Sequence, residues 1–122
     1  IDIVVNNSGV AVTRRAVDVE EADYDEVMDT NLRGAFFVAQ AAGRAMIASQ
    51  RRGRIINIAS AGGLRPLSQI SVYCISKAAV IHMTRALAQE WGRYGINVNA
   101  VCPGYIETEI NRDYWQTEGG RK

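Results

Sequence analysis

Residues 55–77 read IINIASAGGLRPLSQISVYCISK, and this stretch contains the features that decide the fold. Its first residues form an apolar run that predicts a buried β-strand, and the segment from Tyr73 onward has helical spacing. Gly62 and Gly63 loosen the loop between the two. In an open sheet of parallel strands, ligands bind beyond the carboxyl ends of the strands. The strand therefore places Ser60 where a ligand site is expected.

The helix after this loop is expected to hold a phenol beside an ammonium. Tyr73 and Lys77 are four positions apart, so they lie one turn apart on the same face of a helix. A neighbouring cation favours the charged form of a phenol and eases its proton exchange near neutral pH. Loop 60–72 is long enough to bring the Ser60 hydroxyl beside that phenol. A Tyr–Lys pair alone also arises by chance on many helices, so its surroundings have to support the assignment.

The rest of the chain predicts an α/β fold. Residues 3–5 form a short apolar run typical of a parallel strand buried on both faces, and residues 96–101 are expected to form a third strand. Residues 19–29, 35–50 and 73–92 have helical character, and positions 80, 83 or 84, 87 and 91 give the last of these a core-facing stripe. The order strand, helix, strand, helix, strand implies three parallel strands with right-handed crossovers. Both crossover helices are then expected on one face of the sheet. This is part of a doubly wound parallel-sheet fold.

Composition excludes several classes of partner. A net charge of +1 is too small to suggest binding to nucleic acid or to an anionic membrane, and 48% hydrophobic with 22% charged residues is ordinary for one soluble domain. Cys74 and Cys102 form neither a disulfide framework nor a metal-ligand pattern, so no metal site is expected. No apolar run approaches the length of a membrane span. The default location is the cytoplasm.

The segment 35–50, AFFVAQAAGRAMIASQ, is apolar around most of its circumference. A helix of that kind has to be covered on more than one side. One side is expected to face the sheet and the other a partner subunit. Burial within one larger domain is the alternative.

Five landmarks occur in order along the chain: Asn6-Asn7-Ser8-Gly9, Asn31, Ser60, Tyr73 with Lys77, and Pro103-Gly104. On these landmarks the sequence resembles the short-chain dehydrogenase/reductase family over nearly its whole length, with Ser8 in place of the family's usual Ala. The resemblance implies a Rossmann fold and an NAD(P)-dependent oxidoreductase that interconverts an alcohol and a ketone or aldehyde. It also implies a homo-oligomer, a dimer or tetramer, when the protein is full length.

The resemblance further implies a role for each landmark. Ser60 would hydrogen-bond the carbonyl oxygen, Tyr73 would donate the proton, and Lys77 would support Tyr73 and bind the nicotinamide ribose. The backbone carbonyl of Asn31 would hold a water that leads to the lysine. The positions implied to bind the cofactor are Asn7, Ser8, Gly9, Tyr73, Lys77, Pro103, Gly104, Ile106 and Thr108.

Within the family, residues 106–109 and the sequence as a whole look most like bacterial 3-oxoacyl-acyl-carrier-protein reductases. Sugar or polyol dehydrogenases share the same motifs and are the alternative. The epimerase branch shares the Tyr–Lys pair, but the position of Ser60 and the Asn-Asn-x-Gly and Pro-Gly motifs favour a dehydrogenase.

The family's glycine-rich turn for the pyrophosphate does not occur in these residues, nor does the strand end that selects between NAD and NADP. Residues 1–122 are therefore expected to be the central part of one NAD(P)-binding domain, incomplete at both ends and inactive alone. A non-catalytic fragment that acts as an interaction module is a further alternative.

Overall fold

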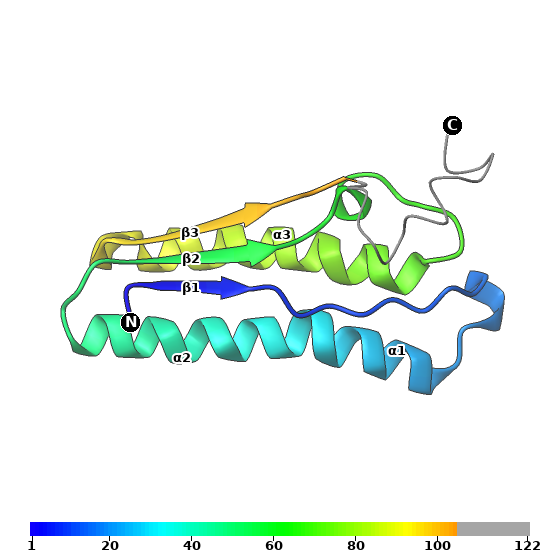
Figure 1. Ribbon diagram of the computed structural model, residues 1–122, viewed down its shortest axis with the longest axis horizontal. Coiled ribbons are helices and arrows are strands. Elements are labelled where there is room, and N and C mark those ends of the chain that lie inside the picture. The colour runs from blue at the N-terminus through cyan, green and yellow to red at the C-terminus, as the bar shows by residue number, and fades with distance from the viewer. Residues whose placement is uncertain (105–122) are drawn as a thin grey trace, which may run out of the picture.

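All three strands run parallel and pair in the order in which they occur in the sequence (Figure 1). The computed structural model describes residues 1–104, with β1 at Ile3–Asn6, β2 at Gly53–Ile58 and β3 at Ile96–Val101. Val4 pairs with Ile55, and Ile55 pairs with Val98, so the strands start and end close to one another. The predicted α/β class and strand order are confirmed. Ile106 and Thr108 lie outside the described residues.

Both crossovers place their helices on the same face of the sheet, as predicted (Figure 1). The first contains α1 (Glu21–Met28), η2 (Asp29–Arg33) and α2 (Gly34–Ala48), and the second contains α3 (Ser71–Trp91). Helices are confirmed in the predicted regions 19–29 and 35–50. The structure adds that they are continuous through η2, a π-helical turn in which the Gly34 N–H bonds the Asp29 carbonyl. No helix in residues 1–104 is long and apolar enough to cross a membrane.

The core lies between the sheet and the two long helices. The predicted stripe on α3 is confirmed, because Val80, Met83 and Leu87 are buried. Shorter 3-10 turns complete the chain: η1 (Ala16–Asp18), η3 (Ala61–Gly63) and η4 (Gly92–Tyr94). The buried apolar cluster consists of Ala39, Ala42, Met46, Ile55, Ala59, Val80, Met83, Leu87, Ile96 and Val98.

The second face of the sheet is open within the described residues. Ile3 and Val5 of β1 are 58% and 55% exposed, whereas Val98 of β3, which points to the helices, is buried. Both crossover helices lie on one side of the sheet, so no described residue covers these side chains, as the predicted one-sided crossovers imply.

A buried polar ladder links the sheet to the helices. Asn57, which is 0% exposed, accepts a hydrogen bond from Asn6 Nδ2 at 2.9 Å and donates to Thr84 Oγ1 at 3.0 Å. Thr84 in turn donates to the Val80 carbonyl at 2.8 Å, and Asn6 Nδ2 also reaches the Ala35 carbonyl. Buried polar groups are costly unless they are paired. This ladder therefore holds β1, β2, α2 and α3 in one arrangement.

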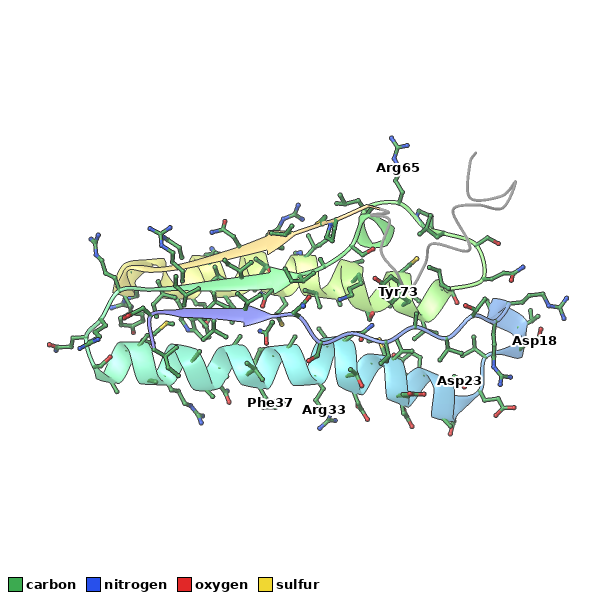
Figure 2. All side chains as sticks on the ribbon, viewed as in Figure 1. Asp18, Asp23, Arg33, Phe37, Arg65 and Tyr73 are labelled. Carbon is green, nitrogen blue, oxygen red and sulfur yellow. The ribbon has the colours of Figure 1, made fainter. Side chains whose placement is uncertain are left out.

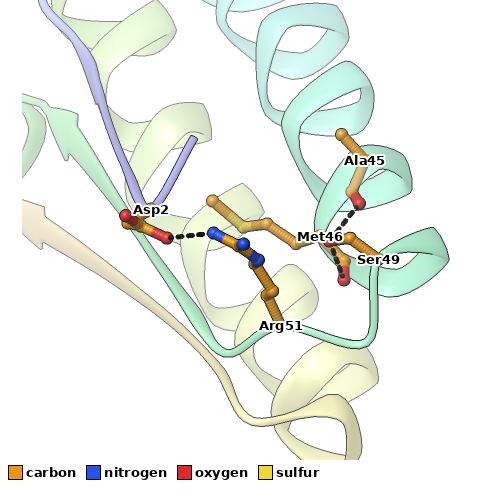
Figure 3. Close-up of polar contacts among 5 residues, drawn as sticks. All are labelled: Asp2, Ala45, Met46, Ser49 and Arg51. Atoms are coloured by element: carbon orange, nitrogen blue, oxygen red, sulfur yellow. Dashed lines mark hydrogen bonds and ion pairs between the residues drawn. The ribbon is translucent and has the colours of Figure 1, made fainter.

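The turn from α2 into β2 is held by local polar contacts (Figure 3). The Ser49 hydroxyl donates to the carbonyls of Ala45 at 2.9 Å and Met46 at 3.2 Å, which satisfies acceptors that the helix end leaves free. Arg51 Nη1 lies 3.7 Å from the Asp2 carboxylate, and both side chains are exposed.

The η3 turn packs directly on the backbone of α3. A Cβ atom added to Gly63 would lie 2.8 Å from the Lys77 carbonyl carbon and 2.9 Å from the Ala78 nitrogen. Because both neighbours are helix backbone, neither can move aside cheaply. Gly63 therefore allows the turn that follows Ser60 to approach the helix that carries Tyr73 and Lys77.

We predict that Gly63→Ala destabilises the fold by about 1–3 kcal/mol, the usual cost of overpacking. Gly92→Ala is the matched control, because a Cβ at Gly92 would meet nothing within 4 Å and its φ of −56° suits any residue. The measurement is urea-induced unfolding of the full-length protein. Equal midpoints for the two variants would contradict the close approach at Gly63.

Candidate active site

A cavity of about 730 Å³ opens at the carboxyl ends of the three strands. Its size lies in the range of pockets that hold small molecules. Apolar side chains such as Val10, Leu67 and Ile70 form much of its wall. It brings together seven of the predicted site residues, which are Asn7, Gly9, Ser60, Tyr73, Lys77, Pro103 and Gly104.

Two of the predicted site residues do not line this cavity. Ser8 is exposed and is absent from the cavity lining. Asn31 is 1% exposed and lies behind the loop that forms one wall. The residues that line the cavity can therefore contact a ligand, whereas Asn31 bonds to the loop that forms part of the wall.

Ser60 follows the end of β2 and caps the η3 turn. Its Oγ accepts a hydrogen bond from the Gly62 N–H at 3.0 Å. A hydroxyl has one donor and two acceptor lone pairs, so this bond leaves its O–H able to donate to a ligand in the cavity. The fold thus orients Ser60 as a donor.

Tyr73 and Lys77 lie on the first turns of α3, as the spacing predicted. The Lys77 Nζ atom is 5.8 Å from the centroid of the Tyr73 ring and donates to the Ile58 carbonyl at 2.9 Å. Lys77 is only 4% exposed, and this burial lowers the pKa of its ammonium below the ordinary value of 10.5. An ammonium has three donors, so two remain beyond the bond to Ile58.

The Asn31 side chain makes three hydrogen bonds that sequence reasoning did not anticipate. Its Oδ1 accepts from the Val10 N–H at 2.8 Å, and its Nδ2 donates to the Val10 carbonyl at 2.8 Å. The same Nδ2 donates to Ser76 Oγ at 3.0 Å, and Ser76 donates to the Tyr73 carbonyl at 2.7 Å. Ser76 was missed, although its position three residues after Tyr73 and directly before Lys77 was a usable signal.

Gly9 lies against the lysine. A Cβ at this position would be 3.3 Å from Lys77 Nζ and 3.6 Å from Asn31 Oδ1. The family resemblance implies that Gly9 binds the cofactor, and the absence of a side chain there also leaves room for the Lys77 ammonium. The loop after β1 and the start of α3 therefore meet at this point.

The chain matches the model of the short chain dehydrogenase family over residues 1–119. It belongs to that family. Most of the landmark residues that carried the resemblance thus line one cavity, while Asn6, Ser8 and Asn31 do not.

Named relatives include sugar and polyol enzymes. The chain is 44% identical over 120 residues to the NAD-dependent glycerol dehydrogenase of Listeria innocua, covering 98% of this chain and 47% of that protein. It is 49% identical over 112 residues to the galactitol 2-dehydrogenase of Rhizobium johnstonii, covering 88% and 43%.

A solved structure of a gluconate 5-dehydrogenase from Burkholderia cenocepacia, in complex with NADP and tartrate, superposes with a TM-score of 0.90. It is 40% identical to this chain and covers 98% of this chain, which in turn covers 47% of that protein. The chain spans less than half the length of these three relatives.

We predict that Lys77 makes folding stability depend on alkaline pH. Because its pKa is lowered in the folded state, the unfolded chain binds more protons between that lowered pKa and 10.5, so stability rises with pH in this window. Lys77→Met should remove that part of the rise. Urea unfolding of the full-length protein, without cofactor, between pH 7 and 10 measures the difference.

Arg85→Met is the control for the alkaline series, because Arg85 is exposed on the same helix and an arginine does not titrate in this range. It should keep the wild-type slope. A Lys77→Met slope that matches wild type would show that burial does not shift Lys77.

Proposed function

We propose that the protein containing this chain is an NAD(P)-dependent oxidoreductase that interconverts a hydroxyl and a carbonyl group on a polyol or sugar-acid type of substrate. The observation that carries the proposal is that Ser60, Tyr73 and Lys77 line one cavity, with the Lys77 ammonium buried next to the Tyr73 ring. The names of the relatives favour a sugar or polyol dehydrogenase over the 3-oxoacyl-acyl-carrier-protein reductase suggested by the sequence of residues 106–109.

Each residue has a defined part in the proposed chemistry. In the reducing direction the Ser60 O–H donates to the carbonyl oxygen, and Tyr73 gives its phenolic proton to the same oxygen. Lys77 is proposed to support Tyr73 and to bind the nicotinamide ribose, as the family resemblance implies. In the oxidising direction Tyr73 takes the proton back. Asn31 is proposed to supply a water-held path for protons, as the family resemblance implies.

The described residues fit a nicotinamide dinucleotide. The cavity is large enough for one end of it, and the two further donors of Lys77 suit ribose hydroxyls. Asn7, Gly9, Pro103 and Gly104 would form the surrounding wall. When bound, the nicotinamide supplies or accepts the hydride. The proposal covers both NAD and NADP, because the names of the relatives include each.

We also propose that these residues are the central part of one NAD(P)-binding domain. The exposed Ile3 and Val5 support this proposal, because parallel sheets normally have both faces covered. The length of the relatives is consistent with further chain to cover that face.

Oligomer formation through α2 and α3 is proposed for the full-length protein. An apolar groove between these helices contains Phe36, Phe37, Met83 and Leu87. Phe37 is 53% exposed (Figure 2), and the two phenylalanine rings pack edge to face with centroids 5.2 Å apart. An exposed apolar groove of this kind is suited to a second copy of the protein.

We predict that the full-length protein oxidises polyols or sugar acids with NAD or NADP, and that Tyr73→Phe abolishes most of this turnover. The variant deletes the proton-transfer group and little volume, so kcat should fall by roughly 100-fold or more while cofactor binding stays nearly intact. Absorbance of the reduced cofactor measures turnover, with acetoacetyl thioesters as the competing substrate class.

Tyr94→Phe is the control for Tyr73→Phe, because Tyr94 lies on η4 at the opposite end of α3. It should behave as wild type. Turnover of Tyr73→Phe within a few-fold of wild type would refute the assignment of Tyr73 as the proton donor. A preference of the wild-type protein for thioesters would instead favour a 3-oxoacyl-acyl-carrier-protein reductase.

We predict that Phe37→Glu lowers the mass of the full-length protein in sedimentation, because a charge in the apolar groove disfavours burial against a second subunit. Tyr94→Glu, a charge introduced at another exposed aromatic outside the groove, should leave the mass unchanged. An unchanged mass for Phe37→Glu would exclude this groove as the interface.

A further inference from the structure

Ser76 is the only described serine whose side chain is 0% exposed and bonded on both sides. Its hydroxyl donates to the Tyr73 carbonyl at 2.7 Å and accepts from Asn31 Nδ2 at 3.0 Å. Because a hydroxyl has a single hydrogen, the direction of this chain of bonds is fixed. Ser76 cannot touch a ligand, since it does not line the cavity.

The bonds of Ser76 lead through Asn31 to Val10, which lines the cavity. Both hydrogens of Asn31 Nδ2 are used, one on Ser76 and one on the Val10 carbonyl, while Asn31 Oδ1 receives the Val10 N–H. Val10 follows Gly9, which has little spare room beside the Lys77 Nζ atom. The hydroxyl of Ser76 is therefore the link between the first turn of α3 and the loop after β1.

The same arrangement occurs a second time on α3, away from the cavity. The Thr84 hydroxyl donates to the Val80 carbonyl at 2.8 Å and accepts from Asn57 Nδ2 at 3.0 Å. Thr84 is also buried, at 6% exposure. The two hydroxyls make matching bonds, but only the Ser76 network contains residues of the cavity wall.

We propose that Ser76 is a positioning residue of the reaction, which sets the spacing between the Gly9–Val10 loop and the Tyr73–Lys77 pair by orienting the Asn31 amide. This inference rests on the proposed oxidoreductase function. Without the Ser76 hydroxyl, one Asn31 N–H is left buried without its partner, while the two bonds between Asn31 and Val10 remain. Asn31 and the loop bonded to it then lose their tie to the first turn of α3, so the loop can shift relative to Lys77 and the cavity wall shifts with it.

The experiment compares Ser76→Ala with Thr84→Val in the full-length protein. Each variant removes one buried hydroxyl with the same two bonds, so a merely structural role predicts similar effects from both. We expect Ser76→Ala to lower kcat about tenfold or more and to raise the KM for the cofactor, because misplacing a positioned group by about 1 Å can cost 100-fold. Thr84→Val should destabilise the protein while keeping kcat within about twofold of wild type, on the same positional argument.

A readout independent of turnover is hydrogen exchange of the Val10 amide, which donates to Asn31 Oδ1. Ser76→Ala should speed this exchange more than Thr84→Val does at equal overall stability, matched by choice of temperature. Ser76→Cys, which keeps a weaker donor, should give intermediate exchange and intermediate kcat. If Ser76→Ala does not fold, Ser76→Cys becomes the test against Thr84→Val.

The outcomes distinguish a failure of the proposed oxidoreductase function from a failure of the positioning role of Ser76. A wild-type protein that turns over no polyol, sugar acid or thioester with either cofactor refutes the proposed function, and with it the assigned role of Ser76 in the reaction. An active wild type, in which Ser76→Ala and Thr84→Val have equal kcat, KM and Val10 exchange, overturns only the positioning role. Faster Val10 exchange together with a loss of kcat in Ser76→Ala alone supports it.

Discussion

The buried ammonium of Lys77 is the constraint on which the site depends. Burying a charge is costly unless hydrogen bonds compensate it, and here the Ile58 carbonyl at the end of β2 accepts one of its hydrogens. That bond requires the strand end and the first turns of α3 to lie together. Gly63 packs on the Lys77 backbone and Gly9 on its Nζ atom, so the turn after β2 and the loop after β1 meet at the same residue.

The same pattern of side-chain hydrogen bonds occurs twice along α3. In each case a hydroxyl on the helix donates to a carbonyl of the preceding turn and accepts from an asparagine of a neighbouring element. Networks of this kind are rigid when every member is satisfied. Around Asn57 the network fastens strands to the helix, and around Asn31 it fastens a loop of the cavity. The arrangement of the site therefore depends on buried polar contacts as much as on apolar packing.

Two apolar surfaces lie outside the core, and both follow from the topology. Right-handed crossovers in one direction along the sheet put α2 and α3 on the same side, so Ile3 and Val5 on the other side have no cover among the described residues. The outer sides of the same helices carry Phe36 and Phe37 in an apolar groove. The sheet surface suits further parts of the same domain, and the helix surface suits a second subunit.

Local patterns in the sequence determined the strands, their parallel order, the buried stripe of α3 and the one-turn spacing of Tyr73 and Lys77, because these follow from periodicities of two and 3.6 residues. They also placed Ser60 beyond the end of a strand. Only the tertiary structure decided that α1 and α2 are continuous through a π-turn, that the Asn31 amide brackets Val10, and that Ser76 joins Asn31 to Tyr73. These contacts join residues distant in the sequence, and their geometry depends on side-chain direction at the place where separate elements meet, which no local periodicity encodes.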